Sequence, residues 1–245
     1  RARRQVTVLD TGTRRNRYAA HAHNLLGFDG VPPEEIHATA RRQVEAYPTI
    51  RFVDAKALSA EGEAGDFLVR SEAGEHRAKR LILSYGVADQ DPHIPGFAEC
   101  WGVSVLHCPY CHGYEVADRR WGLIYSTPMS LHATSLYMDW TDQVTLFTDG
   151  HDLPEAERSK LGKRGVVLVD GKVAAIDHEA GQLSAVRMED GSSVALDALF
   201  VHPNNKPSAT LHEDLGLKMA ETPVGTAIKV DDKQQTSREG VYAAG

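Results

Sequence analysis

Short apolar runs, typical of buried strands, alternate along the chain with helix candidates and polar hairpins. The first half predicts a strand at residues 5–10, a helix at 32–46 and a strand at 50–58. The helix candidate opens with proline and acidic residues, which suit the free N–H groups of a first helical turn. A polar hairpin at 67–77 and an apolar strand at 80–86 complete this half.

The second half repeats the same order of elements. The matching segments are a strand at 143–149, a helix at 154–163, a strand at 166–176, a hairpin at 183–194 and a strand at 198–202. Such agreement indicates a duplication. Parallel strands joined by helices, with a three-stranded antiparallel insertion, are typical of a dinucleotide-binding domain. The predicted fold class is therefore α/β, with two Rossmann-like dinucleotide-binding domains of the FAD/NAD(P) type, each with a three-stranded antiparallel β insertion.

Composition and charge narrow the possible functions. The chain has 245 residues, of which 42% are hydrophobic and 25% charged, and its net charge is −7. These values are ordinary for a globular protein and leave no basic footprint for nucleic acid. No apolar run approaches the roughly 20 residues of a membrane span, and no signal-peptide pattern opens the chain. Three cysteines are too few for a disulfide scaffold, so a cytoplasmic location is expected.

The most informative segment contains two cysteines, Cys108 and Cys111, separated by Pro109 and Tyr110. Such a pair can form a reversible disulfide when it starts a helix, because the free N–H groups and the helix dipole there stabilise a thiolate. Proline suits the first turn of that helix. The adjacent histidines, His107 and His112, can favour the thiolate when protonated or move protons during exchange.

Three other interpretations of this segment compete. Cys-x-x-Cys-His is also the attachment pattern of covalent haem, but no export signal accompanies it. A structural zinc site needs a second Cys/His pair at compatible spacing, and Cys100 is solitary. An inert buried pair is the third alternative. A redox pair is the favoured interpretation.

The run from His107 to Glu115, His-Cys-Pro-Tyr-Cys-His-Gly-Tyr-Glu, is similar to the active-site segment of thioredoxin-reductase-like flavoproteins. These belong to class II of the FAD-dependent pyridine nucleotide-disulfide oxidoreductases, and the similarity is greatest to bacterial members and to the dithiol oxidases of disulfide natural products. The resemblance implies that Cys111 faces the flavin and that Cys108 exchanges with an outside dithiol or disulfide. His112 stands where ordinary thioredoxin reductases carry an acid, and an imidazole there can also take and give protons. A homodimer, and a small dithiol/disulfide or a thioredoxin-like protein as substrate, are further implications.

The resemblance also implies a domain plan. The second half has its own opening unit, a strand at 121–125 and a helix at 129–140, which has no equivalent before the strand at 5–10. The flavin-binding glycine turn is therefore expected upstream of Arg1. At the other end, 239–245 resembles the family's closing flavin motif. The predicted domains are an FAD-binding part at 1–97, a NAD(P)-binding-like domain with both cysteines at 98–222, and a return to the FAD-binding domain at 223–245.

Flavin-contacting residues follow from position within this plan. Asp10 ends the first strand, where dinucleotide folds place the ribose-binding acid. Gly86 follows Tyr85, which replaces the usual threonine of an Ala-Thr-Gly motif. The full predicted set is Asp10, Arg15, Asn16, His23, Gly86 and Gly245. No metal site is expected, because the His-x-His pair that includes His23 lacks a third ligand.

The nicotinamide site is in doubt. Such a site needs glycines between strand and helix, so that the backbone can approach a pyrophosphate. No glycine lies between Gly122 and Ser130, and Pro128 removes one N–H donor. Asp149 stands where NADPH-using relatives place arginines, and its charge repels a 2′-phosphate. NAD(P)H binding therefore stays open as a prediction.

The predicted activity is that of an FAD-dependent dithiol/disulfide oxidoreductase, an enzyme acting on a sulfur group through Cys108, Cys111 and His112. One alternative is a dithiol oxidase that passes electrons to oxygen without a nicotinamide coenzyme. Another is a non-catalytic descendant that uses the fold for redox sensing or binding.

Overall fold

The computed structural model describes residues 3–222 and 225–245. The chain divides into two compact units. The first unit comprises Arg1–Arg17, Glu34–Gln90 and Asn204–Gly245. The second comprises Tyr18–Pro33 and Asp91–Pro203.

The units group residues by contact, and the predicted domain boundaries stay a prediction. Residues 204–222, assigned from sequence to the NAD(P)-binding-like domain, cluster with the first unit, because β16 (Asn205–Pro207) pairs with β7 (Val87–Asp89). Residues 18–33 cluster with the second unit instead of the first. The predicted boundaries remain a description of the duplicated plan.

A five-stranded parallel sheet forms the centre of the second unit, in the order β11-β10-β9-β15-β8. Every residue of β9, β10 and β15 is buried, which is why Thr145 is the one polar residue among them. The strands span Val105–Leu106 (β8), Trp121–Ile124 (β9), Val144–Phe147 (β10), Val167–Val169 (β11) and Ala198–Phe200 (β15).

Two layers cover this sheet. Helices α4 (Pro128–Tyr137) and α5 (Glu155–Lys163) follow β9 and β10, and side chains such as Tyr137 and Leu161 join one core cluster with the sheet. An antiparallel sheet of β12 (Val173–Glu179), β13 (Gln182–Met188) and β14 (Ser193–Ala195) contributes Val186 and Met188 to a second cluster. The short helices α2 (Phe97–Cys100) and α3 (Pro109–His112) complete the unit.

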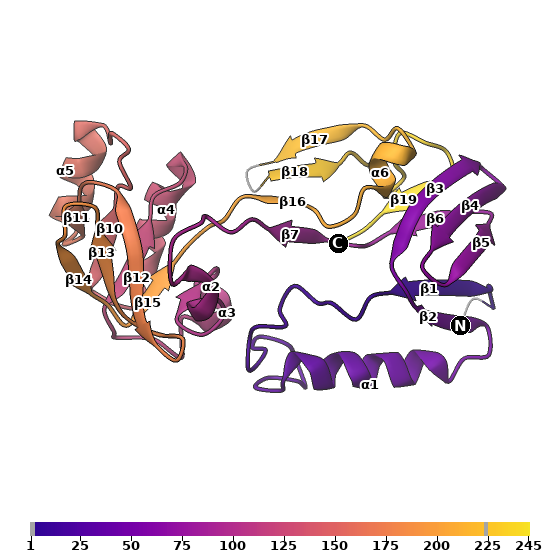
Figure 1. Ribbon diagram of the computed structural model, residues 1–245, viewed down its shortest axis with the longest axis horizontal. Coiled ribbons are helices and arrows are strands. Elements are labelled where there is room, and N and C mark those ends of the chain that lie inside the picture. The colour runs from indigo at the N-terminus through magenta and orange to yellow at the C-terminus, as the bar shows by residue number, and fades with distance from the viewer. Residues whose placement is uncertain (1–2, 223–224) are drawn as a thin grey trace. The chain divides into compact units, whose positions relative to one another are not determined.

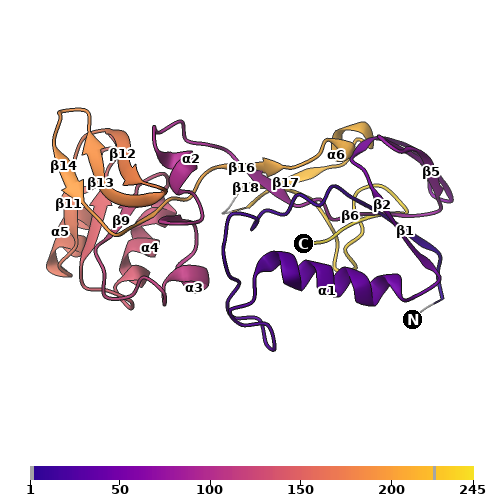
Figure 2. The same ribbon diagram turned by 60° about the horizontal axis from the view of Figure 1, so that its bottom comes forward.

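The first unit contains a parallel pair, β1 (Val6–Asp10) and β2 (Ile50–Asp54), with α1 (Pro33–Glu45) running beside it (Figures 1 and 2). Arg41 of α1 stacks over Phe52 with its guanidinium carbon 4.7 Å from the ring centroid, and it also pairs with Asp54. An antiparallel sheet follows, made of β3 (Ala57–Glu63), β4 (Asp66–Ser71) and β5 (Gly74–Ala78).

Returning segments close the first unit. Strand β19 (Val241–Ala243) pairs in parallel with β6 (Leu81–Leu83), and β17 (Met219–Thr222) forms a hairpin with β18 (Gly225–Ile228). Helix α6 (Leu211–Asp214) adds Leu211 to the core cluster of this unit. The predicted fold class, with one three-stranded antiparallel insertion per half, is confirmed.

Two predicted strands are each divided in the structure. The segment 50–58 separates into β2 and β3, and 166–176 separates into β11 and β12. At the second break Gly171 has φ 100°, a left-handed conformation that interrupts a strand and that glycine adopts readily. The helix predicted at 129–140 ends at Tyr137, after which residues 138–140 form a turn. Among the described helices none is long and apolar enough to cross a membrane.

Candidate redox site

The two cysteines lie at the start of α3, directly after strand β8. Cys108 is the N-cap residue, with extended backbone (φ −130°, ψ 122°), and Pro109 occupies the first helical position. The amides of Cys111 and His112 donate to the Cys108 carbonyl at 3.1 and 3.3 Å, which closes the turn. Cys108 is half-buried and Cys111 is exposed. The two cysteines therefore lie on one helical turn, where Cys108 is partly covered by the protein and Cys111 is exposed to solvent.

Contacts with other residues of the second unit hold this turn in place. The amide of Gly113 donates to the Pro109 carbonyl at 2.6 Å, and a Cβ at Gly113 would lie only 2.4 Å from that oxygen. The ring of Tyr110 meets Trp140 edge-on, with centroids 5.4 Å apart. Asn24, from the 18–33 segment, donates its side-chain amide to the Tyr110 carbonyl at 2.5 Å. The turn is therefore held by contacts with Trp140 and with Asn24 of the 18–33 segment.

His112 is half-buried at the end of α3. Burial lowers its pKa, and the charge of His23 lowers it further, whereas the carboxylate of Glu115 raises it. Because burial is the largest of these effects, the imidazole is neutral at physiological pH and able to accept a proton. His23 itself lies 3.3 Å from Glu115 (Nε2 to Oε1), so this predicted flavin ligand belongs to the surroundings of the cysteine turn.

The side chains of His202, which is half-buried, and Tyr137, which is buried, were not predicted as site residues. The ring of His202 lies perpendicular to that of His107 at 5.5 Å, and its Nε2 lies 3.3 Å from the hydroxyl of Tyr137. Strand pairing brings the histidines together: β8 and β15 are adjacent and parallel, and each is followed within two residues by a histidine. That pairing is the signal by which sequence reasoning could have found His202.

Two of the predicted flavin residues of the first unit, Asp10 and Arg15, make local contacts. The carboxylate of Asp10 accepts the Gly12 amide at 2.9 Å and lies 3.3 Å from Nε2 of His37. Arg15 donates to both carboxylate oxygens of Asp89, at 2.8 and 2.6 Å. These contacts order the loop after β1, where a dinucleotide fold presents its ribose-binding acid.

Other features of the first unit fit a bound dinucleotide. Gly86 (φ 66°) has open space where a Cβ would stand, so a ligand can approach its backbone. Gly245 has φ 130°. The Nε atom of Arg14 is buried and has no hydrogen-bond partner among the described residues. An unpaired buried cationic donor suits a phosphate oxygen. Asn16 is exposed.

The turn between β9 and α4 is closed by its own side chains. The hydroxyl of Ser130 accepts the amides of Ser126 and Thr127 at 3.1 and 3.4 Å, and Pro128 has no amide to offer. A pyrophosphate would need these N–H groups. On the next strand, Asp149 (φ 50°) accepts the Val173 amide at 3.0 Å. The donor set here does not fit a nicotinamide dinucleotide.

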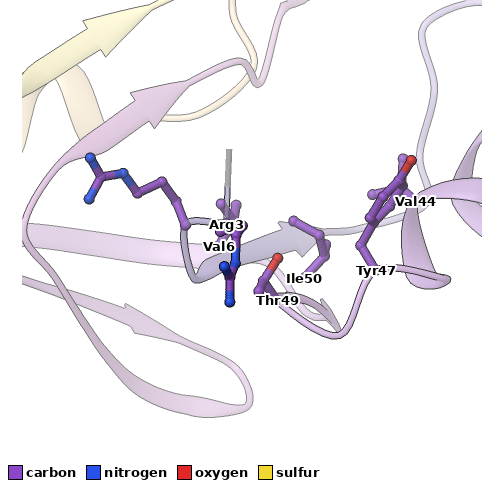
Figure 3. Close-up of a pocket in the computed structure, with 7 residues that line it drawn as sticks. Arg3, Val6, Val44, Tyr47, Thr49 and Ile50 are labelled. Carbon is purple, nitrogen blue, oxygen red and sulfur yellow. The ribbon is translucent and has the colours of Figure 1, made fainter. Parts of the chain in front are cut away.

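A separate pocket of about 250 Å³ opens at one end of the β1–β2 pair (Figure 3). Its apolar floor comes from strands β1 and β2 and from the end of α1. None of its lining residues is a predicted site residue; they are Arg3, Arg4, Val6, Val44, Tyr47, Thr49 and Ile50.

A family model described as pyridine nucleotide-disulphide oxidoreductase matches residues 1–245. The chain belongs to this family, and within it to the thioredoxin-reductase-like oxidoreductases. Members of this family typically depend on FAD.

Relatives and solved structures agree with this assignment. The thioredoxin reductase tcpT of Claviceps purpurea is 34% identical over all of this chain and 79% of its own length. The structure of an oxidoreductase from Agrobacterium tumefaciens is 40% identical, with a TM-score of 0.93 over all of this chain and 82% of that one. The structure of HlmI is 34% identical, with a TM-score of 0.89 over all of this chain and 77% of that one.

Proposed function

We propose that this protein is an FAD-dependent dithiol/disulfide oxidoreductase in which Cys108 and Cys111 carry electrons between a substrate and the flavin. The observation that carries the proposal is the placement of the two cysteines on one turn, at the N-cap and third position of α3, held rigidly by Gly113 and Tyr110. A cysteine pair at this spacing closes and opens a disulfide with little movement of the backbone.

The exchange is a pair of thiolate substitutions. In the direction of dithiol oxidation, a substrate thiolate attacks the Cys108 sulfur of the enzyme disulfide, and Cys111 leaves as a thiolate. The second substrate thiolate then displaces Cys108, which releases the substrate disulfide and leaves both enzyme cysteines reduced. The flavin, when bound, supplies the two-electron acceptor that reforms the enzyme disulfide.

His112 is proposed to handle the protons of this exchange. Its imidazole is neutral at physiological pH because burial lowers its pKa, so it can accept a proton from a substrate thiol. Its place directly after Cys111 keeps it beside the pair in either redox state. Glu115 and His23, which adjust its pKa, are proposed as positioning residues.

The direction of electron flow is proposed to be dithiol oxidation, with oxygen as the final acceptor. The closed turn at Ser126–Ser130 supports this direction, because the amides that would hold a coenzyme pyrophosphate already bond to Ser130. Anaerobic titration of the flavoprotein with NADH and NADPH tests it. No bleaching of the flavin band is expected, and prompt bleaching by either coenzyme would contradict the absence of a nicotinamide site.

The remaining parts of the proposal concern partners. A small dithiol/disulfide or a thioredoxin-like protein is the proposed substrate, and the exposed position of Cys111 together with the half-buried Cys108 is compatible with either. The active form is proposed to be a cytoplasmic homodimer. Sedimentation of the purified flavoprotein measures its assembly directly.

Cysteine variants of the full-length flavoprotein test the whole mechanism. Cys108→Ser and Cys111→Ser should each abolish dithiol turnover. Cys100→Ala is the matched control, because Cys100 lies in the same unit, is fully buried and joins the core cluster. It should keep turnover. Unchanged turnover in both serine variants would remove the mechanism, and a wild-type protein without turnover would favour the non-catalytic alternative.

A further inference from the structure

Helix α1 places two side chains against the carboxylates that end strands β1 and β2. Asp10 and Asp54 are the last residues of these strands and are partners in their parallel register. Nε2 of His37 lies 3.3 Å from Oδ2 of Asp10. One turn later in α1, Nη1 of Arg41 lies 2.6 Å from Oδ1 of Asp54. Residues four apart on a helix are neighbours on its surface, so one face of α1 meets both carboxylates.

The arginine contact occurs again in the second half of the chain. Arg158 of α5 donates to both carboxylate oxygens of Asp170, at 3.1 and 2.6 Å, and Asp170 directly follows β11. In the duplicated order of elements this pair corresponds to Arg41 with Asp54. A contact that is present in both halves serves the packing of the helix against the strands.

The histidine contact is confined to the first half. Pro154 stands one helical turn before the arginine of α5, where the first half has His37. Thr148 follows β10 and hydrogen-bonds to the aspartate of the arginine pair, so it takes the position of Asp10. The acid one residue later, Asp149, accepts a backbone amide of β12 at 3.0 Å. The histidine contact therefore belongs to the half whose features fit a bound dinucleotide, and the half with the closed coenzyme turn lacks it.

The carboxylate of Asp10 is contacted at both of its oxygens. Oδ1 accepts the amide of Gly12 at 2.9 Å, and Oδ2 is the oxygen beside the His37 ring. Together these contacts restrict rotation of the carboxylate. An ionised carboxylate offers about four acceptor positions, so about two stay available to a ligand. The Asp10 side chain is 24% exposed, and a Cβ at Gly12 would meet nothing within 4 Å, so a ligand can reach this carboxylate.

We propose that His37 is a positioning residue that fixes the Asp10 carboxylate for the hydroxyls of the adenosine ribose of FAD. This inference rests on the proposed function, which makes FAD the cofactor. It also uses the place of Asp10 at the end of β1, where dinucleotide folds put the ribose-binding acid. His37 acts through Asp10. Because the orientation of the carboxylate is already restricted, less conformational freedom is lost when the ribose binds, and FAD binds more tightly.

Binding of FAD tests this role and needs no turnover. Apoprotein prepared from the full-length flavoprotein is titrated with FAD, and the change in flavin fluorescence gives the dissociation constant. His37→Leu removes the ring nitrogens and should raise the dissociation constant for FAD about fivefold. His37→Gln, whose side-chain amide can still donate to Asp10, should stay within about twofold of the wild type.

FMN separates the positioning role from a general loss of structure. It carries the same isoalloxazine ring as FAD but lacks the adenosine ribose. His37→Leu should therefore leave the dissociation constant for FMN unaltered. In an Asp10→Ala background, which lacks the carboxylate, His37→Leu should cause no further loss of FAD affinity, because the group that it orients is already gone.

Arg41→Gln is the matched control, because it changes the other contact of the same helix face. Its FAD and FMN dissociation constants should equal those of the wild type. Unchanged FAD affinity in His37→Leu, an equal loss for FMN, an equal loss in Arg41→Gln, or a loss that persists in the Asp10→Ala background would overturn the positioning role. A wild-type apoprotein that binds no FAD would overturn this role together with the proposed function. Dithiol turnover that survives Cys108→Ser would remove the proposed exchange mechanism alone.

Discussion

One ion pair at the N-terminal ends of the sheet strands β9 and β15 allows a stability prediction with a defined pH window. Arg120 and Asp197 immediately precede β9 and β15, and the guanidinium donates to both carboxylate oxygens at 2.8 and 2.6 Å. The amides of Asp197 and Ala198 also donate to the Arg120 carbonyl. The pair therefore joins the entries of the two strands whose other ends carry Tyr125 and His202.

Asp197→Asn removes the charge and keeps the shape. The hydrogen bonds from Arg120 lower the pKa of Asp197 from 3.8 to about 2, which at full weight corresponds to about 2.5 kcal/mol. Solvent screens the pair, since its side chains are 46% and 34% exposed, so we expect a loss of about 1 kcal/mol at pH 7. A carboxylate with a lowered pKa stabilises the fold above pH 3.8, and this contribution disappears as the pH falls toward 2.

Urea unfolding followed by tryptophan fluorescence measures this difference. The three tryptophans, Trp101, Trp121 and Trp140, all belong to the second unit, so the signal reports the unit that contains the pair. The variant should unfold at lower urea at pH 7 and at pH 5.5, with the gap narrowing below pH 4. Asp177→Asn, which breaks a more exposed pair with Arg187, is the control and should shift stability by less than about 0.5 kcal/mol. An equal gap at pH 3 and pH 7, or none at pH 7, would refute the electrostatic origin.

Three further predictions concern the sheet, the closed turn and the proton-handling residue. Gly122→Ala should destabilise the second unit by about 1–3 kcal/mol in the same urea assay, because the added Cβ would lie 2.5 Å from Leu196 Cδ1 in a packed core. Ser130→Ala should cost about 1 kcal/mol by removing a side chain that caps α4, and unaltered stability would contradict that capping role. Glu115→Gln should move the acidic limb of the pH–rate profile for dithiol turnover to lower pH, because it removes the charge that raises the pKa of His112 against burial. A limb that stays in place or moves upward would show that His112 does not set it.

The duplicated order of elements was predictable from the sequence because strands that are buried in the sheet consist mainly of apolar residues. Residues of β9 and β10 are buried without exception, so both strands appear in the sequence as mainly apolar segments, with Thr145 the one polar residue. The breaks within the longer segments 50–58 and 166–176 were not predicted, although each coincides with a short polar interruption. The chain changes sheet at Asp54-Ala55-Lys56 and at Asp170-Gly171-Lys172.

The candidate site was likewise predictable only in part. Cys108, Cys111 and His112 lie within five consecutive residues, so their spacing alone indicated a turn that can start a helix. The pair formed by His202 and Tyr137 involves residues that are distant in sequence, and they meet because β15 pairs with β9, the strand that α4 follows. The role of Ser130 also depends on geometry, since a serine hydroxyl caps its own helix only when the preceding turn folds back on it.

The closed turn bears on the direction of the reaction. In a two-domain reductase the second dinucleotide site supplies electrons, and its glycine-rich turn leaves amides available for a pyrophosphate. Here those amides donate to Ser130 at the start of helix α4, so a pyrophosphate would have to displace an internal cap worth about 1 kcal/mol to reach them. The cysteine turn has the opposite character, because Cys108 and Cys111 lie at the start of α3 and are followed directly by His112, whose pKa burial lowers. A cysteine pair combined with a coenzyme turn whose amides are already bonded favours dithiol oxidation. In that direction, electrons enter from the substrate dithiol and leave through the flavin.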